Sequence, residues 1–176
     1  MELLQVRSEL DPVLDIYREL NARRVLEIGS WDGGTIREWL INGTDTLTVF
    51  AVDLEHRNRD TYPEWTKPGQ STVLHIGDSL QQPAKDFIAN NGPYEFALID
   101  GDHGLNAVRS DYETVLPHMN KGGVIALHDI DGGEGFGADY GPGVLLREIE
   151  ETGLRVARFI DPTPMGWAHG LGLVWT

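Results

Sequence analysis

Five side chains that could act as acids, bases or metal ligands stand directly after two apolar stretches of the sequence. They follow residues 95–99 and 124–127 and are Asp100, Asp102, His103, His128 and Asp129. Carboxylates and imidazoles are the usual general acids and bases of enzymes, and together they also bind divalent cations. A plainer explanation stands beside this one, since Asp102 could cap a helix and His128 could hydrogen-bond Asp129 at the strand end.

Acidic residues also stand at the ends of three further apolar stretches: they are Glu27, Asp53 and Asp78. One acid after a strand means little, because Asp is a common helix cap. Five successive strands that end in this way indicate that the site lies at the carboxyl ends of the strands. In an open α/β sheet, ligands bind outside the carboxyl ends of the strands, so we expect these acids to surround one ligand site.

The elements that must position these side chains alternate between strands and helices. Strands are expected at residues 23–28, 46–52, 71–76, 95–99, 124–127, 154–160 and 171–175. Helices are expected near residues 10–17, 35–40, 83–90, 105–119 and 144–151. The first helix is expected to have Asp11 as its N-cap and Pro12 as its first residue.

This alternation predicts a single doubly wound, mostly parallel α/β sheet of seven strands with helices on both faces. The last two strands have no helix between them, so we expect them to pair antiparallel. A chain of 176 residues fits one domain, which we expect to span residues 1–176. We expect an N-terminal helix within residues 1–22 and a glycine-rich lid loop at residues 131–143. Residues 56–70 are expected to form an irregular connection or one short helix.

The stretch 29–34 predicts a tight turn where a ligand can approach the main chain, because three of its residues are glycine. It lacks the G-x-G-x-x-G pattern of dinucleotide sites, since Trp31 stands at the second glycine position. Glu27 and Asp32 suit a ligand with positive charge, such as S-adenosylmethionine, better than a pyrophosphate.

Two further acids could recognise an adenosine. Asp53 could accept hydrogen bonds from both ribose hydroxyls, a role that NAD sites and S-adenosylmethionine sites share. Asp78 and Ser79 could face an adenine edge, or they could merely cap the next helix.

The formal net charge of −14 and the isoelectric point near 4.6 disfavour nucleic acid and anionic membranes as partners. The absence of cysteine excludes disulfides and thiolate metal sites, and it suits a cytoplasmic location. No apolar run is long enough to span a bilayer. A small-molecule partner is therefore expected.

Taken together, the motifs resemble those of class I S-adenosylmethionine-dependent methyltransferases. They read EIGSWDGGT from Glu27, VD from Val52, GDS from Gly77, LIDGDH from Leu98 and GGVIALHD from Gly122. The resemblance spans roughly residues 25–149 and is strongest to the branch of cephalosporin-hydroxylase-like proteins and metal-dependent sugar O-methyltransferases. It implies a Rossmann-like domain with sheet order 3-2-1-4-5-7-6 and a reversed last strand. The class usually has glycine at position 31, where this chain has tryptophan.

The resemblance also implies functional roles for particular residues. Cofactor contacts would come from Glu27, Gly29, Asp53 and Asp78, and the expected cofactor site also includes Ser30, Trp31, Gly33, Leu54, Gly77, Ser79 and Asp100. Acids at the positions of Asp100, His128 and Asp129 would hold a divalent metal, Mg or Mn. The base would be Asp102, with His103 as an alternative. Imidazole suits Mn, Fe or Zn better than Mg, so His128 leaves the identity of the metal open.

The function predicted from the sequence is O-methylation of a small sugar, polyol or phenol by S-adenosylmethionine, with a divalent metal as an assisting group. Three alternatives stay open: a non-haem iron oxygenase, a nicotinamide oxidoreductase and a non-catalytic nucleoside-binding module. Because the chain is too small for a separate substrate domain, we also expect a homo-oligomer in which neighbouring subunits help to form the acceptor pocket.

Overall fold

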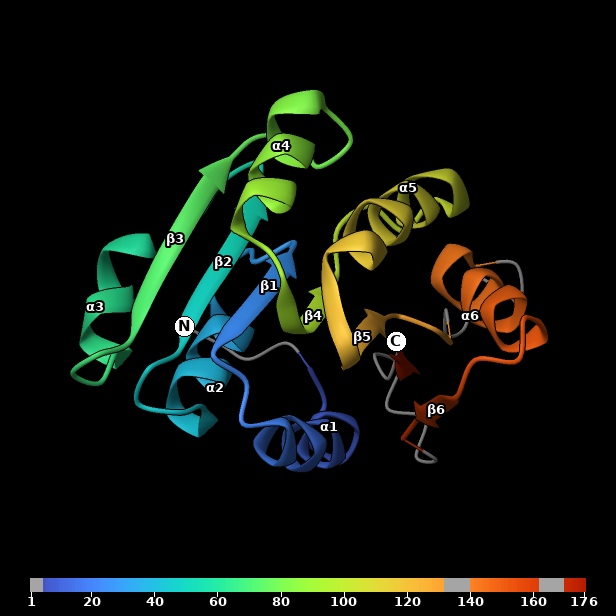
Figure 1. Cartoon of the computed structure of the whole chain (residues 1–176), viewed down its shortest axis with the longest axis horizontal. Coiled ribbons are helices and arrows are strands. Elements are labelled where there is room, and N and C mark those ends of the chain that lie inside the picture. Colours follow the sequence, from blue (N-terminus) through green and yellow to red (C-terminus); the bar gives the residue numbers. More distant parts are fainter. Residues whose placement is uncertain (1–4, 132–139, 162–169) are drawn as a thin grey trace.

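A seven-stranded sheet forms the centre of the computed structural model, which describes residues 5–131, 140–161 and 170–176. The strands lie in the order β3-β2-β1-β4-β5-β7-β6 (Figure 1). Their bounds are β1 (Arg24–Ile28), β2 (Thr48–Asp53), β3 (Ser71–Ile76), β4 (Tyr94–Ile99), β5 (Met119–His128), β6 (Val156–Phe159) and β7 (Leu171–Trp175). The pairs among the first five strands are parallel, and β7 is antiparallel to both β5 and β6. The predicted sheet order and the reversed last strand are confirmed.

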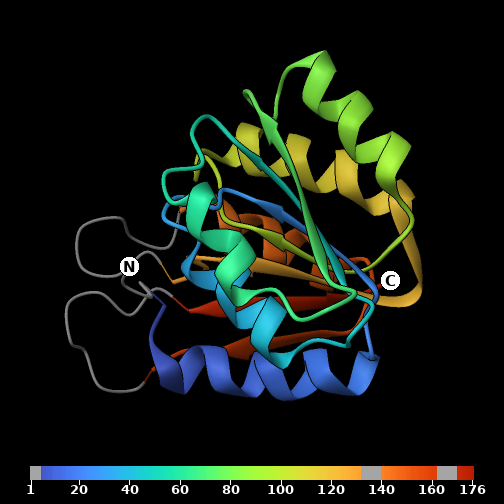
Figure 2. The same ribbon diagram turned by 90° about the vertical axis from the view of Figure 1, so that its left-hand side faces the viewer.

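Helices cover both faces of the sheet, as predicted (Figure 2). One face is covered by α1 and α2, and the other by α4, α5 and α6. The bounds are α1 (Arg7–Leu20), α2 (Gly34–Asn42), α3 (Tyr62–Trp65), α4 (Gln82–Asn91), α5 (Leu105–Val115) and α6 (Gly141–Glu151). Short 3-10 turns lie at Arg59–Thr61 and Leu116–His118. Residues 56–70 were expected to form either an irregular connection or one short helix, and they contain the short helix α3.

The central strand β1 shows how the sheet assigns each side chain to a face. Successive residues of a strand point to opposite faces. Leu26 and Ile28 accordingly pack in the core beneath α4, α5 and α6, whereas Val25 packs in the core beneath α1 and α2. Glu27 follows the direction of Val25 and is buried against α2. A carboxyl group therefore enters the protein interior directly before the glycine turn.

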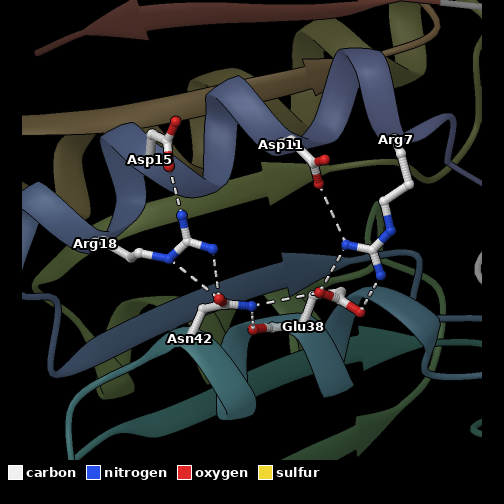
Figure 3. A network of polar contacts seen from close by, with 6 residues as sticks. All are labelled: Arg7, Asp11, Asp15, Arg18, Glu38 and Asn42. Atoms are coloured by element: carbon white, nitrogen blue, oxygen red, sulfur yellow. Dashed lines mark hydrogen bonds and ion pairs between the residues drawn. The ribbon is translucent and has the colours of Figure 1, made fainter.

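A polar network holds α1 against α2 (Figure 3). The guanidinium of Arg7 forms an ion pair with Glu38 at 2.7 Å, and it also contacts Asp11. One turn from the other end of α1, Arg18 donates to the Asn42 side chain at 2.6 Å. Both arginines are about half exposed, so each contact adds little stability. Their effect is to fix the direction of α1, and with it the segment that precedes this helix.

The start of the first helix differs from the prediction. The helix α1 begins at Arg7, so Asp11 is not its N-cap and Pro12 lies inside it. A proline this near the N-terminus removes only the hydrogen bond to the Ser8 carbonyl, which costs less than a break in the middle of a helix. The earlier start also buries Leu10 and places the buried Glu9 carboxylate where it accepts the N–H groups of Asp161 and Gly170.

Two other boundaries also differ. The helix α6 begins at Gly141, inside the predicted loop 131–143, because Pro142 is favoured in the first turn of a helix. Residues 132–139 of that loop lie outside the described residues. The helix α5 ends at Val115, and Met119, which was expected on its apolar stripe, opens β5 instead. Within the described part of the chain, no helix is both long and apolar enough to cross a bilayer.

Candidate active site

The glycine turn after β1 packs directly on the loop after β4. Gly29 has φ +84°, a conformation that side chains rarely adopt, and a Cβ atom there would lie 2.5 Å from the Asp100 carbonyl carbon. Asp100 and Gly29 therefore stand on adjacent strand ends with their backbones in contact. The prediction that these strand ends share one site agrees with this geometry.

Asp53, at the end of β2, holds the turn in shape. One of its oxygens accepts hydrogen bonds from the backbone N–H groups of Ser30 at 2.6 Å and Trp31 at 2.7 Å. The other oxygen accepts the N–H of Glu55 at 3.0 Å. The buried His56 supports the same turn, with its Nδ1 2.7 Å from the Ser30 hydroxyl.

Glu27 lies beneath this turn and does not face a ligand. It is 0% exposed, and its two oxygens accept hydrogen bonds from Thr35 at 2.6 Å and the Trp39 indole at 2.5 Å. Burial raises the pKa of this carboxyl to about 8, against the lowering effect of the two hydrogen bonds. The structure thus corrects the expectation of a direct cofactor contact: Glu27 braces α2 against β1 from inside.

A pocket opens beside the turn, at the carboxyl ends of β1 and β4. Its lining consists of Gln5, Gly29, Ser30, Trp31, Asp32, Gly34, Thr35 and Asp100. Trp31 is half exposed and packs its ring against the Arg57 guanidinium, 3.5 Å from the ring centre. Gln5 donates to the Asp100 carboxylate at 3.2 Å. Sequence reasoning missed Gln5, because no motif includes it and only the direction of α1 brings it there.

The residues expected near an adenine lie on the outer part of the same edge. Leu54, directly after β2, is 72% exposed, so it offers apolar surface on which a ligand ring could pack. Asp78 is exposed and one of its oxygens accepts the N–H of Leu80 at 2.9 Å. Gly77 and Ser79 flank it, half-buried. This contact closes a turn before α4, whose N-cap is Gln81, so Asp78 is not that helix's cap. The other Asp78 oxygen accepts a hydrogen bond from the Gln81 side-chain amide at 3.4 Å.

Two carboxylates and two imidazoles meet at the ends of β4 and β5. His128 Nδ1 lies 3.1 Å from Asp100 Oδ1 and 2.9 Å from Asp129 Oδ1. His103 Nε2 lies 3.1 Å from Asp129 Oδ2 and 3.5 Å from Asp100 Oδ1. Asp129 has φ +58°, a strained conformation for a non-glycine residue that is typical of functional sites. We call Asp100, His103, His128 and Asp129 the strand-end cluster.

The charges of the strand-end cluster compensate one another. Burial would raise the pKa of Asp100, but the charge of His128 and the nearby imidazole of His103 outweigh it and lower this pKa to about 2. The Asp100 carboxylate beside it raises the pKa of His103. Burial would lower the pKa of His128, but Asp100 and Asp129 raise it well above its ordinary value. The cluster is thus built from two anions and two groups that become cations next to them.

The arrangement fits a divalent cation. Ligand atoms of Asp100, His103 and Asp129 all lie within 4.8 Å of one another. His103 Nε2 and His128 Nδ1 are buried, yet neither forms a hydrogen bond of good geometry with the carboxylates beside it. Nitrogens that face carboxylates without such bonds are typical of metal sites, in which the ion lies between the donors. Compared with the expected ligand set, the geometry adds His103 as a candidate beside His128.

Asp102 stands apart from the strand-end cluster. It is exposed, and its Oδ1 accepts the N–H of Gly104 at 2.7 Å, just before α5. This contact closes a turn before the helix: the N-cap of α5 is Gly104, so Asp102 is not the helix cap that its plainer explanation proposed. Of the two expected bases, the structure brings His103 into the cluster.

Two buried groups near the site were not anticipated. Asp111 of α5 is 1% exposed, neither of its oxygens has a hydrogen bond, and burial raises its pKa to about 6. The Tyr62 hydroxyl is also buried without a partner, and its ring lies under Gly33. Their residue types gave no signal in the sequence, since both stand on ordinary helical positions.

Comparisons with known proteins show the family of the chain. Residues 26–130 match the model of a family described as a methyltransferase domain. Demethylmacrocin O-methyltransferase of Streptomyces fradiae is 28% identical over 130 residues, which cover 68% of this chain and 31% of that protein. This chain thus spans about a third of that relative's length.

Solved structures share the fold. An O-methyltransferase from Bacillus cereus in complex with SAH superimposes with a TM-score of 0.75 at 16% identity, over 97% of this chain and 80% of that one. The MycE methyltransferase of the mycinamycin biosynthetic pathway, in complex with Mg, SAH and mycinamycin VI, gives a TM-score of 0.65 at 20% identity. That match covers 93% of this chain and 47% of MycE.

Proposed function

The chain belongs to the methyltransferase-domain family, and from this premise we propose that it transfers a methyl group from S-adenosylmethionine to a hydroxyl oxygen of a small acceptor. The observation that carries the proposal is the strand-end cluster, which adjoins the glycine turn through the contact between Gly29 and Asp100. A group that would accept a proton or bind an ion thus lies next to the pocket that would receive one end of the cofactor.

The cofactor would lie across the ends of β1, β2 and β3. Its methionine end would enter the pocket beside Gly29, its ribose would reach Asp53, and its adenine would pack on Leu54 beside Asp78 and Ser79. Asp32 and Asp53 give this region negative charge, which favours a sulfonium over a pyrophosphate. Ser30, Trp31, Gly33 and Gly77 would shape the site through their backbone.

The reaction moves one methyl group and one proton. The acceptor oxygen forms a bond to the methyl carbon as the carbon–sulfur bond breaks, and the sulfonium becomes a neutral thioether. The acceptor O–H proton must pass to a base. We propose His103 Nε2 for this role, because His103 faces the cluster whereas Asp102 is exposed and bonds the Gly104 N–H in the turn before α5.

Asp100 and Asp129, with an imidazole from His103 or His128, would hold a divalent ion at the same place. Such an ion, when bound, supplies Lewis acidity that lowers the pKa of a hydroxyl group. If His103 is the ion's ligand, the proton passes to Asp102 instead. In the first case His103 Nε2 needs a lone pair to accept the proton, and in the second it needs a lone pair to bind the ion.

The other candidate functions fit less well. A non-haem iron oxygenase is expected on a double-stranded β-helix, whereas this chain has a doubly wound sheet. The nicotinamide fingerprint is missing from the glycine turn. The acceptor class we propose, a sugar, polyol or phenol, is supported by the acidic surface and by the O-methyltransferase names of the relatives. The cytoplasmic location and the homo-oligomer stay predictions.

Calorimetry with SAH, NADH and Fe(II), each titrated alone, tests the proposal. We expect SAH to bind with micromolar affinity, and NADH not to bind. Methyl transfer from labelled S-adenosylmethionine to a panel of sugars and phenols then tests the activity. Binding of NADH in preference to SAH would refute the proposed function.

A further inference from the structure

Tyr140 contacts the strand-end cluster through His103. This residue directly precedes α6, and its hydroxyl forms a short hydrogen bond with His103 Nδ1. The two rings lie edge to face, with centres 5.3 Å apart and planes at 68°. His103 is therefore held at one nitrogen by Tyr140, while its other nitrogen faces Asp100 and Asp129.

The backbone next to Tyr140 fixes this contact. A Cβ atom on Gly141 would lie 2.6 Å from the Leu105 backbone nitrogen and still closer to the His103 carbonyl oxygen. The first turn of α6 thus lies directly on the loop that carries His103. This packing keeps the backbones of Tyr140 and His103 close together, which places the two side chains within reach of their hydrogen bond.

The hydrogen bond allows two proton arrangements in neutral His103. If Nδ1–H donates to the Tyr140 oxygen, Nε2 keeps a lone pair that points at Asp100 and Asp129. If Tyr140 donates to Nδ1, Nε2 must carry the proton and can neither accept one nor bind an ion. The first arrangement is the one that a base or an ion-binding nitrogen requires, because the nitrogen that faces Asp100 and Asp129 is Nε2.

We propose that Tyr140 is a positioning residue that accepts a hydrogen bond from His103 Nδ1 and thereby keeps the Nε2 lone pair directed at the strand-end cluster. The proposal rests on the proposed function, because an Nε2 lone pair is what a base or an ion-binding nitrogen needs. The protein group that bonds one nitrogen of a histidine sets which nitrogen is free. Tyr140 serves either role of His103.

The test uses Tyr140→Phe, which removes the hydroxyl and keeps the ring. Tyr112→Phe is the matched control, since it removes a tyrosine hydroxyl from α5 that forms no hydrogen bond with Asp100, His103, His128 or Asp129. Nitrogen-15 NMR of histidine-labelled protein reports which ring nitrogen carries the proton, and the spectrum of His103→Gln identifies the His103 signals. The spectra are recorded with saturating SAH at a pH where His103 is neutral.

We expect His103 to carry its proton on Nδ1 in the wild type and in Tyr112→Phe, and to shift toward the Nε2–H form in Tyr140→Phe. We also expect kcat to fall about 10- to 100-fold in Tyr140→Phe, the usual effect of removing a group that orients a catalytic histidine. KM for S-adenosylmethionine should stay unchanged.

An Nε2–H signal for His103 in the wild type, or the same proton position in wild type and Tyr140→Phe, would overturn the proposal. This readout does not require turnover. A protein that fails to bind SAH refutes the proposed function instead. A Tyr140→Phe variant with altered circular dichroism is replaced by Tyr140→Leu, which also removes the hydroxyl and should give the same shift of the His103 proton to Nε2.

Discussion

Glu27→Gln should make the ligand-free protein more stable at neutral and alkaline pH. The wild-type carboxyl is fully buried, and burial raises its pKa from an ordinary 4.5 to about 8. Between these two values the unfolded chain loses the Glu27 proton while the folded chain keeps it. The contribution of the protonated Glu27 to the free energy of unfolding is thus fully present below about pH 4.5 and is lost as the pH rises to about 8.

The size of the effect follows from the shift. Each pH unit over which only the unfolded state is deprotonated lowers the free energy of unfolding by about 1.4 kcal/mol. Over the interval from 4.5 to about 8, the loss is on the order of 3–5 kcal/mol, an upper range for a single buried group. Glutamine keeps an oxygen for the Trp39 indole and an amide that can donate to the Thr35 hydroxyl.

Urea unfolding of both proteins from pH 4 to pH 9 measures this difference. We expect equal stabilities near pH 4 and a gap of roughly 2–4 kcal/mol in favour of Glu27→Gln at pH 8. Glu113→Gln, an exposed acid on α5, is the control and should follow the wild type at every pH. Parallel curves for wild type and Glu27→Gln would show that the buried carboxyl is ionised in the folded state, against the reasoning from burial. SAH affinity should change less than threefold, because Glu27 does not face the pocket.

Three further changes test the site. Gly29→Ala should weaken SAH binding at least tenfold by calorimetry, since its Cβ would collide with the Asp100 backbone; unchanged affinity would mean that the turn can move. Mn²⁺ should bind more tightly than Mg²⁺ because the donors include imidazole, and equal affinities of the two ions would exclude a nitrogen ligand. Asp100→Asn should abolish Mn²⁺ binding, whereas the control Asp78→Asn should preserve it. His103→Gln should lower kcat about 100-fold with SAH affinity retained, whereas Asp102→Ala should lower it only a few-fold; the reverse order would assign the base to Asp102.

Much of the fold could be predicted because it depends on patterns that the sequence carries locally. The apolar runs of β1, β2 and β4 and their alternation with amphipathic helices fix a parallel sheet. Helix ends were harder to predict. Pro12 carries a helix-start signal, yet α1 begins earlier, because the burial of Glu9 and Leu10 against distant strands is invisible in the local sequence.

The candidate site shows the same division between local and distant information. Asp100, His128 and Asp129 were predictable, since each stands at a strand end and adjacent strand ends must meet. Gln5 and Tyr140 were not predicted as site residues, because their positions depend on how α1 and α6 pack. Glu27 was misread for a related reason: its motif position suggests a ligand contact, but the alternation of β1 turns it inward toward Trp39.

These corrections change which acids can attract the cofactor. A neutral Glu27 adds no negative charge at pH 7, because its pKa lies near 8. In the strand-end cluster the carboxylate charges are opposed by two histidines. Attraction for a sulfonium then depends on Asp32 and Asp53, at the turn itself. Removing the charge of an acid at the turn should accordingly weaken cofactor binding, whereas removing the charge of an acid in the strand-end cluster should not. Cofactor binding and proton transfer would thus depend on different acids at the same edge of the sheet.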